Sequence, residues 1–149
     1  MTNKTIYILD DIYWEKIYLE LKRLLPDYIY PVIENIKNPL IYLDEILKLE
    51  PEYVLLDHWF INDDLDESPL GYRFLKALDE KLQYEEETIT KKFFFFEDKK
   101  KVIKRKNIKT QFISISDNGE KLKDRDIYNR YIKDYIISKN ANDIIQLIK

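Results

Sequence analysis

The sequence predicts an α/β fold: a doubly wound, five-stranded, mainly parallel sheet with helices on both faces. Short apolar runs rich in β-branched residues alternate about five times with amphipathic helical patterns along the chain. Such runs are typical of strands that are buried on both faces, as in a parallel sheet. The chain has 149 residues, of which 45% are hydrophobic, so it is long enough to bury an apolar core. Because no linker or internal repeat is visible, residues 1–149 are interpreted as a single domain.

The predicted strands are short and alternate with helices of ordinary length. Trp14, Ile17 and Leu21 recur at helical spacing in the first helix, and Pro26 ends that helix. Asn38 is expected to cap the second helix, because it directly precedes Pro39. The strands are predicted at residues 6–9, 30–33, 53–56, 112–115 and 135–137, and the helices at 14–25, 40–47, 71–82, 120–132 and 143–148.

One segment, approximately residues 84–109, interrupts this alternation between the third helix and the fourth strand. Two β-prone runs, which include the phenylalanines at 93–96 and the Val102-Ile103 pair, flank a charged connection at 97–101. This pattern predicts an inserted β-hairpin. Four consecutive phenylalanines cannot all face one side of a strand, so we expect one face to be covered or to lie at an interface.

Composition and charge exclude several classes of protein. With 25 basic and 28 acidic residues the net charge is −3, so a generally basic nucleic-acid-binding protein is not expected. The basic cluster at 99–109 stands beside acidic residues and is interpreted as a self-neutralising surface. No apolar run approaches the roughly 20 residues of a membrane span, and a cytoplasmic location is expected. The absence of cysteine excludes thiol catalysis, the single histidine excludes a multi-histidine metal centre, and two glycines are too few for a glycine-rich phosphate loop.

Carboxylates follow two of the predicted strands. Asp10 and Asp11 come directly after the first strand, and Asp57 comes directly after the third. Ligands of open parallel sheets bind beyond the carboxyl ends of the strands, so these three side chains share one cleft if the two strands are neighbours. Such clustering raises the pKa of at least one carboxyl group unless a cation compensates for it. A hard divalent cation, Mg²⁺ in the first place, is therefore the expected cofactor.

Two further polar groups are expected at the same edge of the sheet. Ser116 ends the fourth strand and Lys139 follows the fifth, with Ser114 and Lys133 as the alternatives if the register differs. A metal ion and a lysine can neutralise a phosphoryl group during its transfer, while a hydroxyl group binds one of its oxygens and a carboxylate attacks the phosphorus. His58 has no second histidine beside it and is interpreted as a loop residue.

Five segments of the chain together match the pattern of a known family. They are Ile6-Tyr-Ile-Leu-Asp-Asp11, Pro51-Glu-Tyr-Val-Leu-Leu-Asp57, Gly71 at the start of the third helix, Ile113-Ser-Ile-Ser116, and Asp134-Tyr-Ile-Ile-Ser-Lys139. With them the chain resembles a response-regulator receiver domain of two-component signalling, over nearly its whole length apart from the insertion. The resemblance implies the flavodoxin-like receiver fold. It also implies Asp57 as the phosphoacceptor, Ser116 as the switch hydroxyl and Lys139 as the phosphate-binding lysine. Mg²⁺ would be held by Asp10, Asp11, Asp57 and the backbone carbonyl of Trp59.

The resemblance also implies a function. Asp57 would receive a phosphoryl group from a histidine kinase or a phosphotransfer protein, in a reaction that requires Mg²⁺ and includes slow autodephosphorylation. Output would pass through contacts with a downstream protein or through a homodimer, without nucleic acid or a membrane. Asn140 replaces the usual proline after the lysine, Asp117 replaces a small residue, and Ile136 rather than Tyr135 stands three residues before Lys139. The departures at Asn140 and Asp117 and the unusual insertion favour an alternative: a degenerate pseudo-receiver that acts as a protein-interaction or dimerisation module.

Overall fold

The computed structural model describes residues 3–33, 36–61, 67–93, 96–116 and 125–148. Its centre is a parallel sheet with the strand order β1-β2-β7-β8. The strands are β1 (Asn3–Leu9), β2 (Pro51–Leu56), β7 (Gln111–Ser114) and β8 (Ile132–Tyr135). Residues Ile6 to Leu9 and Val54 to Leu56 are at most 1% exposed. This continuous burial, without alternation, is what a strand covered on both faces requires.

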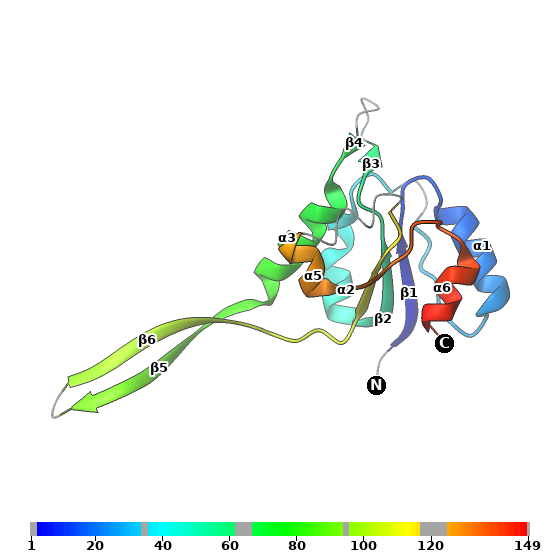
Figure 1. Cartoon of the computed structure of the whole chain (residues 1–149). Helices are drawn as coiled ribbons and strands as arrows, with labels where there is room; N and C mark the ends of the chain where they lie inside the picture. The colour runs from blue at the N-terminus through cyan, green and yellow to red at the C-terminus, as the bar shows by residue number, and fades with distance from the viewer. Residues whose placement is uncertain (1–2, 34–35, 62–66, 94–95, 117–124, 149) are drawn as a thin grey trace.

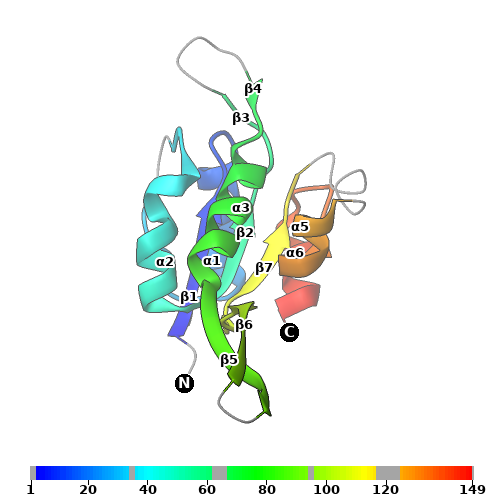
Figure 2. The same cartoon turned by 90° about the vertical axis from the view of Figure 1, so that its left-hand side faces the viewer.

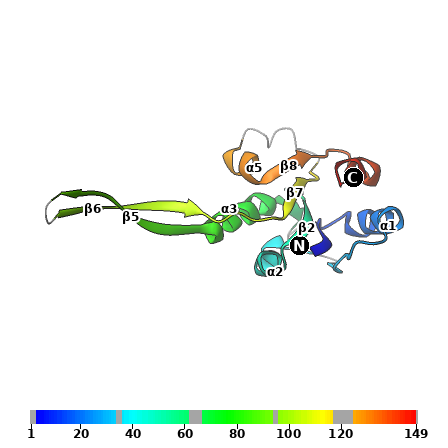
Figure 3. The same cartoon turned by 90° about the horizontal axis from the view of Figure 1, so that it is seen from below.

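Helices cover both faces of the sheet (Figures 1 and 3). One face carries α1 (Trp14–Leu24) and α6 (Ala141–Ile148). The other carries α2 (Leu43–Leu49), α3 (Leu70–Leu82) and α5 (Asp126–Tyr131), with α3 between the other two (Figure 2). The predicted α/β class is confirmed. None of the helices in the described ranges is long and apolar enough to cross a membrane.

Asn38 caps a helical turn, as the sequence predicts. Its side chain accepts a hydrogen bond from the backbone N–H of Leu40 at 3.0 Å. The turn that it caps is a 3₁₀-helix, η1 (Pro39–Tyr42), which leads directly into α2. Glu50 ends α2 in the left-handed conformation with φ 48°, and Pro51 then begins β2.

The predicted second strand at residues 30–33 is wrong for the described chain. Only a single parallel bridge, between Thr5 and Ile29, lies beside β1. Ile29 donates to the carbonyl of Lys4 at 2.8 Å and accepts from the N–H of Ile6 at 2.9 Å. The next donor to β1 would come from Pro31, two residues later, and proline has no N–H group. Pairing therefore stops after one residue, and the described sheet has four strands instead of five.

The last strand begins earlier than predicted. The sequence places it at 135–137, whereas β8 spans Ile132–Tyr135 and pairs with β7 through Phe112 and Ile132. β8 is an edge strand of the described sheet, so the exposed Lys133 within it is compatible with pairing. The predicted helix at 120–132 corresponds to the shorter α5, and its first part, together with Asp117, falls at residues outside the described ranges.

Two long antiparallel strands project from the body between α3 and β7 (Figures 1 and 3). They are β5 (Gln83–Phe93) and β6 (Phe96–Arg105), and residues 94–95 between them lie outside the described ranges. At the base, the register sets Gln83 opposite Arg105 and Tyr84 opposite Lys104, and Lys104 Nζ lies 2.7 Å from Glu86 Oε2. At the same end, Lys106 donates its backbone N–H to the carbonyl of Leu82 at 2.8 Å. A second, two-residue pair joins β3 (Phe60–Ile61) to β4 (Glu67–Ser68) after β2.

Candidate functional site

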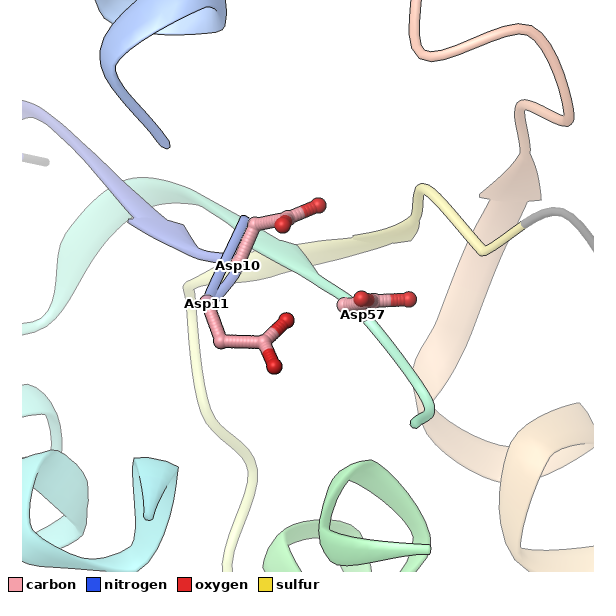
Figure 4. A group of neighbouring side chains, drawn as sticks. All are labelled: Asp10, Asp11 and Asp57. Atoms are coloured by element: carbon pink, nitrogen blue, oxygen red, sulfur yellow. The ribbon is translucent and has the colours of Figure 1, made fainter. Parts of the chain in front are cut away.

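The three predicted carboxylates meet at the carboxyl end of the sheet (Figure 4). Asp10 and Asp11 follow β1 and Asp57 follows β2, and these two strands are neighbours in parallel register. The N–H of Asp57 donates to the carbonyl of Leu9 at 3.0 Å, which aligns the two strand ends. One oxygen from each carboxylate lies within 4.8 Å of the others. Asp10 is 0% exposed and Asp57 6% exposed, so this acidic cluster is largely withdrawn from water.

Asp10 organises the chain between β1 and α1. Its Oδ1 accepts hydrogen bonds from the backbone N–H groups of Ile12 and Tyr13, at 2.9 and 2.8 Å. Aspartate commonly closes a turn in this way, because its short side chain reaches the backbone two and three residues ahead. The turn holds Oδ1, so Oδ2 is the oxygen that remains directed at the centre of the cluster.

A buried lysine completes the cluster. Lys139 Nζ lies 2.8 Å from Asp10 Oδ2 and 3.2 Å from Asp57 Oδ2, and the residue is 7% exposed. Its backbone is in the left-handed region with φ 52°, which is unfavourable for a residue with a side chain. Backbone strain of this kind persists where surrounding contacts impose it, and here the two carboxylates provide them. Lys133, the alternative from the sequence, is exposed in β8 and donates to Gln111.

Two backbone contacts fix the segment around Asp57, one from the next residue and one from α3. Its Oδ1 accepts the N–H of His58 at 2.8 Å. The N–H of Gly71, at the start of α3, donates to the carbonyl of His58 at 3.0 Å. A Cβ atom on Gly71 would lie 2.1 Å from the carbonyl oxygen of Asp57, which is well inside contact distance. Only glycine therefore allows α3 to pack this closely against the end of β2.

The cluster is electrostatically uncompensated. Three carboxylates and one ammonium carry a net charge of −2, and a bound divalent cation would bring this sum to zero. Burial and the charge of Asp10 raise the pKa of Asp57 to about 7, although Lys139 and the His58 N–H oppose the shift. Burial also raises the pKa of Asp11, against the opposing hydrogen bond from Ile61. The folded protein thus holds ionised carboxylates at a cost that a cation would remove.

The donor set fits a hard cation. Asp11 Oδ2 accepts the N–H of Ile61 at 2.7 Å, whereas its buried Oδ1 has no hydrogen-bond partner in the described part of the chain. A buried carboxylate oxygen without a partner, next to two further carboxylates, is suited to bind a metal ion. Trp59 lies two residues after Asp57, and its ring packs edge-on against His58 with 4.8 Å between the ring centroids. A role for its carbonyl as a metal ligand stays a prediction.

Both candidate serines are buried near the end of β7. Ser114 is the last residue of β7 and pairs with Leu56, and its Oγ has no hydrogen-bond partner among the described residues. Ser116 lies two residues further on and is 1% exposed. Ser116 is thus beyond the strand end, at the edge where Asp57 also follows its strand. The choice of Ser116 over Ser114 stays a prediction.

The structure gives His58 an environment that differs from that of an ordinary loop residue. It is 2% exposed, and its Nδ1 lies 2.5 Å from the hydroxyl oxygen of Tyr128, a buried residue of α5. Burial and the charge of Arg125 lower the pKa of His58 to about 4, so the imidazole is neutral at neutral pH. The sequence contains no local signal for this contact, because the two residues are 70 positions apart.

Asp79 is a second residue that the sequence analysis did not select. Its carboxylate accepts hydrogen bonds from Gln83, Arg105, Arg130 and Tyr131 at 2.5–3.0 Å. It therefore ties α3 to the base of β5 and β6 and to the end of α5. Burial alone would raise the pKa of Asp79, but these four donors lower it to about 2. The sequence did contain a signal for this role: Asp79 lies among the leucines at 75, 78 and 82 on the buried side of the helix, and an acidic residue there requires buried partners.

No protein-family model matches this chain, and no curated protein matches its sequence.

Proposed function

We propose that the protein is a receiver-type phosphoacceptor domain in which Asp57 takes a phosphoryl group from a histidine kinase or a phosphotransfer protein. The observation that carries this proposal is the set of groups at the sheet edge: three carboxylates within 4.8 Å and a buried lysine that bridges Asp10 and Asp57. An attacking carboxylate, an acidic metal site and a cation for the phosphoryl oxygens are the parts that such a transfer requires.

The topology supports the receiver fold. With the bridge at Ile29 beside β1, the parallel segments are ordered Ile29, β1, β2, β7 and β8 across the sheet. Numbered along the chain this is the order 2-1-3-4-5, which is that of flavodoxin-like proteins. In this reading β5 and β6 form a hairpin inserted between the third helix and the fourth sheet strand, and the cytoplasm is the expected location.

Each residue of the site has a separate role in the proposed transfer. Asp57 Oδ2 attacks the phosphorus while the bond from phosphorus to the donor's imidazole nitrogen breaks, and its electron pair returns to the imidazole. The His58 N–H holds Oδ1 during the attack. Lys139 then pairs with a phosphoryl oxygen in place of the carboxylates, and the Ser116 hydroxyl donates to another. Asp10, Asp11, Asp57 and the Trp59 carbonyl would hold Mg²⁺, which would neutralise charge on the transferring group.

Thermal unfolding with beryllofluoride, a phosphoryl mimic, tests this function. Wild type should be stabilised by Mg²⁺ with beryllofluoride, by about 2.7 kcal/mol when the mimic is at 100 times its dissociation constant. Asp57→Asn and Lys139→Met should lose this increment, whereas Lys133→Met, which changes an exposed lysine, should keep it. An equal increment in wild type and Asp57→Asn, or none in wild type, would contradict the proposal.

A second candidate is a pseudo-receiver that acts as an interaction or dimerisation module without phosphorylation. It is favoured by the projecting β5–β6 pair, because an isolated two-stranded pair is only marginally stable in water and gains stability by packing against a partner. Asn140 and Asp117 also depart from the receiver pattern. The same experiment separates the two candidates, because a pseudo-receiver gains no stability from beryllofluoride.

A further inference from the structure

His58, the residue after Asp57, joins the acidic cluster to α3 and α5. Its backbone N–H donates to Asp57 Oδ1, its carbonyl accepts from Gly71 of α3, and its imidazole meets the hydroxyl of Tyr128 on α5. Both His58 and Tyr128 are nearly completely buried, at 2% and 1% exposed. A hydrogen bond between two buried neutral groups is costly to leave unmade, so each residue restrains the position of the other.

α3 and α5 are not equally free to move when the Asp57–His58 segment shifts. The contact with α3 is made by backbone atoms without spare room, since a Cβ on Gly71 would lie 2.1 Å from Asp57 O. The contact with α5 is a hydrogen bond between side chains. α5 has only six residues, and the side chain of its N-cap residue, Arg125, makes no capping hydrogen bond. A helix this short depends on tertiary contacts for its stability. A shift of the Asp57–His58 segment is therefore opposed at α3 and transmitted to α5.

We propose that the buried His58–Tyr128 hydrogen bond couples the state of the Asp57 carboxylate to the position of α5. His58 acts as a positioning residue: its N–H orients the carboxylate, and its ring carries any displacement to Tyr128. The inference rests on the proposed function only for the ligand, a phosphoryl group or its mimic on Asp57. Any change at that carboxylate, including its replacement by an amide, would act through the same bond.

The coupling leads to a surface that a partner can reach. The rings of Tyr128 and Tyr72 stack at 15° with 6.4 Å between their centroids, and the Arg125 guanidinium lies 5.2 Å from the Tyr72 centroid. A groove between α3 and α5 is lined by Tyr72, Ile127, three basic residues (Lys76, Arg125 and Arg130) and two acidic ones (Asp79 and Asp126). A displacement of Tyr128 therefore changes the shape of this groove. Its lining has a net charge of +1, so we expect an acidic segment of the downstream protein to distinguish the two shapes.

Nuclear magnetic resonance can observe both ends of this connection. His58 is the single histidine of the chain, so its imidazole nitrogen signals are unambiguous and report the bond to Tyr128. The backbone amides of Ile127 and Asn129 report α5. Tyr128→Phe removes the hydroxyl and keeps the ring, and His58→Phe removes the same bond from the other side. Tyr18→Phe, on α1 at the opposite face, is the matched control.

The first arm needs no ligand. Asp57→Asn should shift the His58 imidazole signals and the α5 amides, and should do so equally in the Tyr18→Phe background. In the Tyr128→Phe or His58→Phe background the α5 shifts should fall at least fivefold. Shifts of the same size in all backgrounds, or no α5 shift in any, would overturn the inference. Dispersed amide spectra establish that each variant is folded.

The second arm adds Mg²⁺ and beryllofluoride. The α5 amides of wild type should shift on saturation, and Tyr128→Phe should abolish that shift and weaken the affinity for the mimic about two- to tenfold. If the Asp57 amide signal shifts to saturation with the mimic while the α5 amides do not shift, the coupling is wrong and the phosphoacceptor function stands. Absence of binding together with a positive first arm would overturn the function and leave the coupling standing.

Discussion

Replacing Asp57 by asparagine is expected to stabilise the metal-free protein, and the gain should grow with pH. Burial and the negative charge of Asp10 raise the pKa of Asp57, so the ionised side chain opposes folding. Between its unfolded and folded pKa values this carboxyl group binds more protons in the folded state than in the unfolded state. The stability of wild type therefore falls as the pH rises through that window, and Asp57→Asn removes this dependence.

The magnitude follows from the pKa and from the hydrogen bonds of the side chain. A rise from 3.8 to about 7 corresponds to roughly 4 kcal/mol above pH 7, at about 1.4 kcal/mol per pKa unit. The His58 N–H donates to Oδ1 and Lys139 to Oδ2, and in asparagine one of these oxygens is replaced by an NH₂ group, so one of the two hydrogen bonds is lost. The lost hydrogen bond offsets roughly 2 kcal/mol. The expected net gain is about 2 kcal/mol above about pH 7, and close to zero near about pH 5.

Urea titrations in a metal chelator, from about pH 5 to about pH 8, measure this difference directly. The same titrations with saturating Mg²⁺ are the control, because a cation bound to ionised Asp57 stabilises wild type and should cancel or reverse the gain. The reasoning is refuted if Asp57→Asn is less stable than wild type at the highest pH in chelator. It is equally refuted if the difference between the two proteins does not depend on pH.

Three further predictions follow from the contacts of single residues. Lys139→Met removes the ammonium between two buried carboxylates, so it should lower the free energy of unfolding by about 3 kcal/mol or more in chelator, with partial recovery in Mg²⁺. Lys133→Met, the control, should change the free energy of unfolding by less than about 0.5 kcal/mol. Urea titration measures both variants. Gly71→Ala forces a Cβ against the carbonyl of Asp57 and should lower stability by about 2 kcal/mol and weaken Mg²⁺ binding in calorimetry, while unchanged values would show that α3 can shift without loss. Asp79→Asn should cost about 2 kcal/mol at neutral pH, because four donors lower the pKa of Asp79 to about 2. This cost should shrink as the pH falls below about 4, where the carboxyl group begins to protonate in the unfolded state, and a cost that is constant down to about pH 3 would contradict the explanation.

Several features of the fold could be predicted because their causes are local. Buried strands are visible in the sequence as continuous apolar runs, as at 6–9 and 53–56. The helical spacing of apolar residues predicts α1, α3 and α6. The cap at Asn38 depends on atoms two residues apart. The misplaced elements also have local causes that a pattern search did not weigh. Pro31 lacks the donor that would extend pairing beyond Ile29, and the edge position of β8 admits charged residues within a strand.

The α/β class could be predicted from the amino-acid sequence. The convergence of Asp10, Asp11 and Asp57 could be predicted on the condition that β1 and β2 are neighbours, because strand ends in a parallel sheet meet at one edge. Which lysine reaches those carboxylates depends on long-range packing. Lys139 and Asp10 are 129 positions apart, and their contact depends on the left-handed backbone conformation of Lys139 after β8. Long-range packing likewise decided the burial of His58 against Tyr128 and the four donors of Asp79. Contacts of this kind arise when separate elements pack together, and no periodicity within one element encodes which side chains will then face each other.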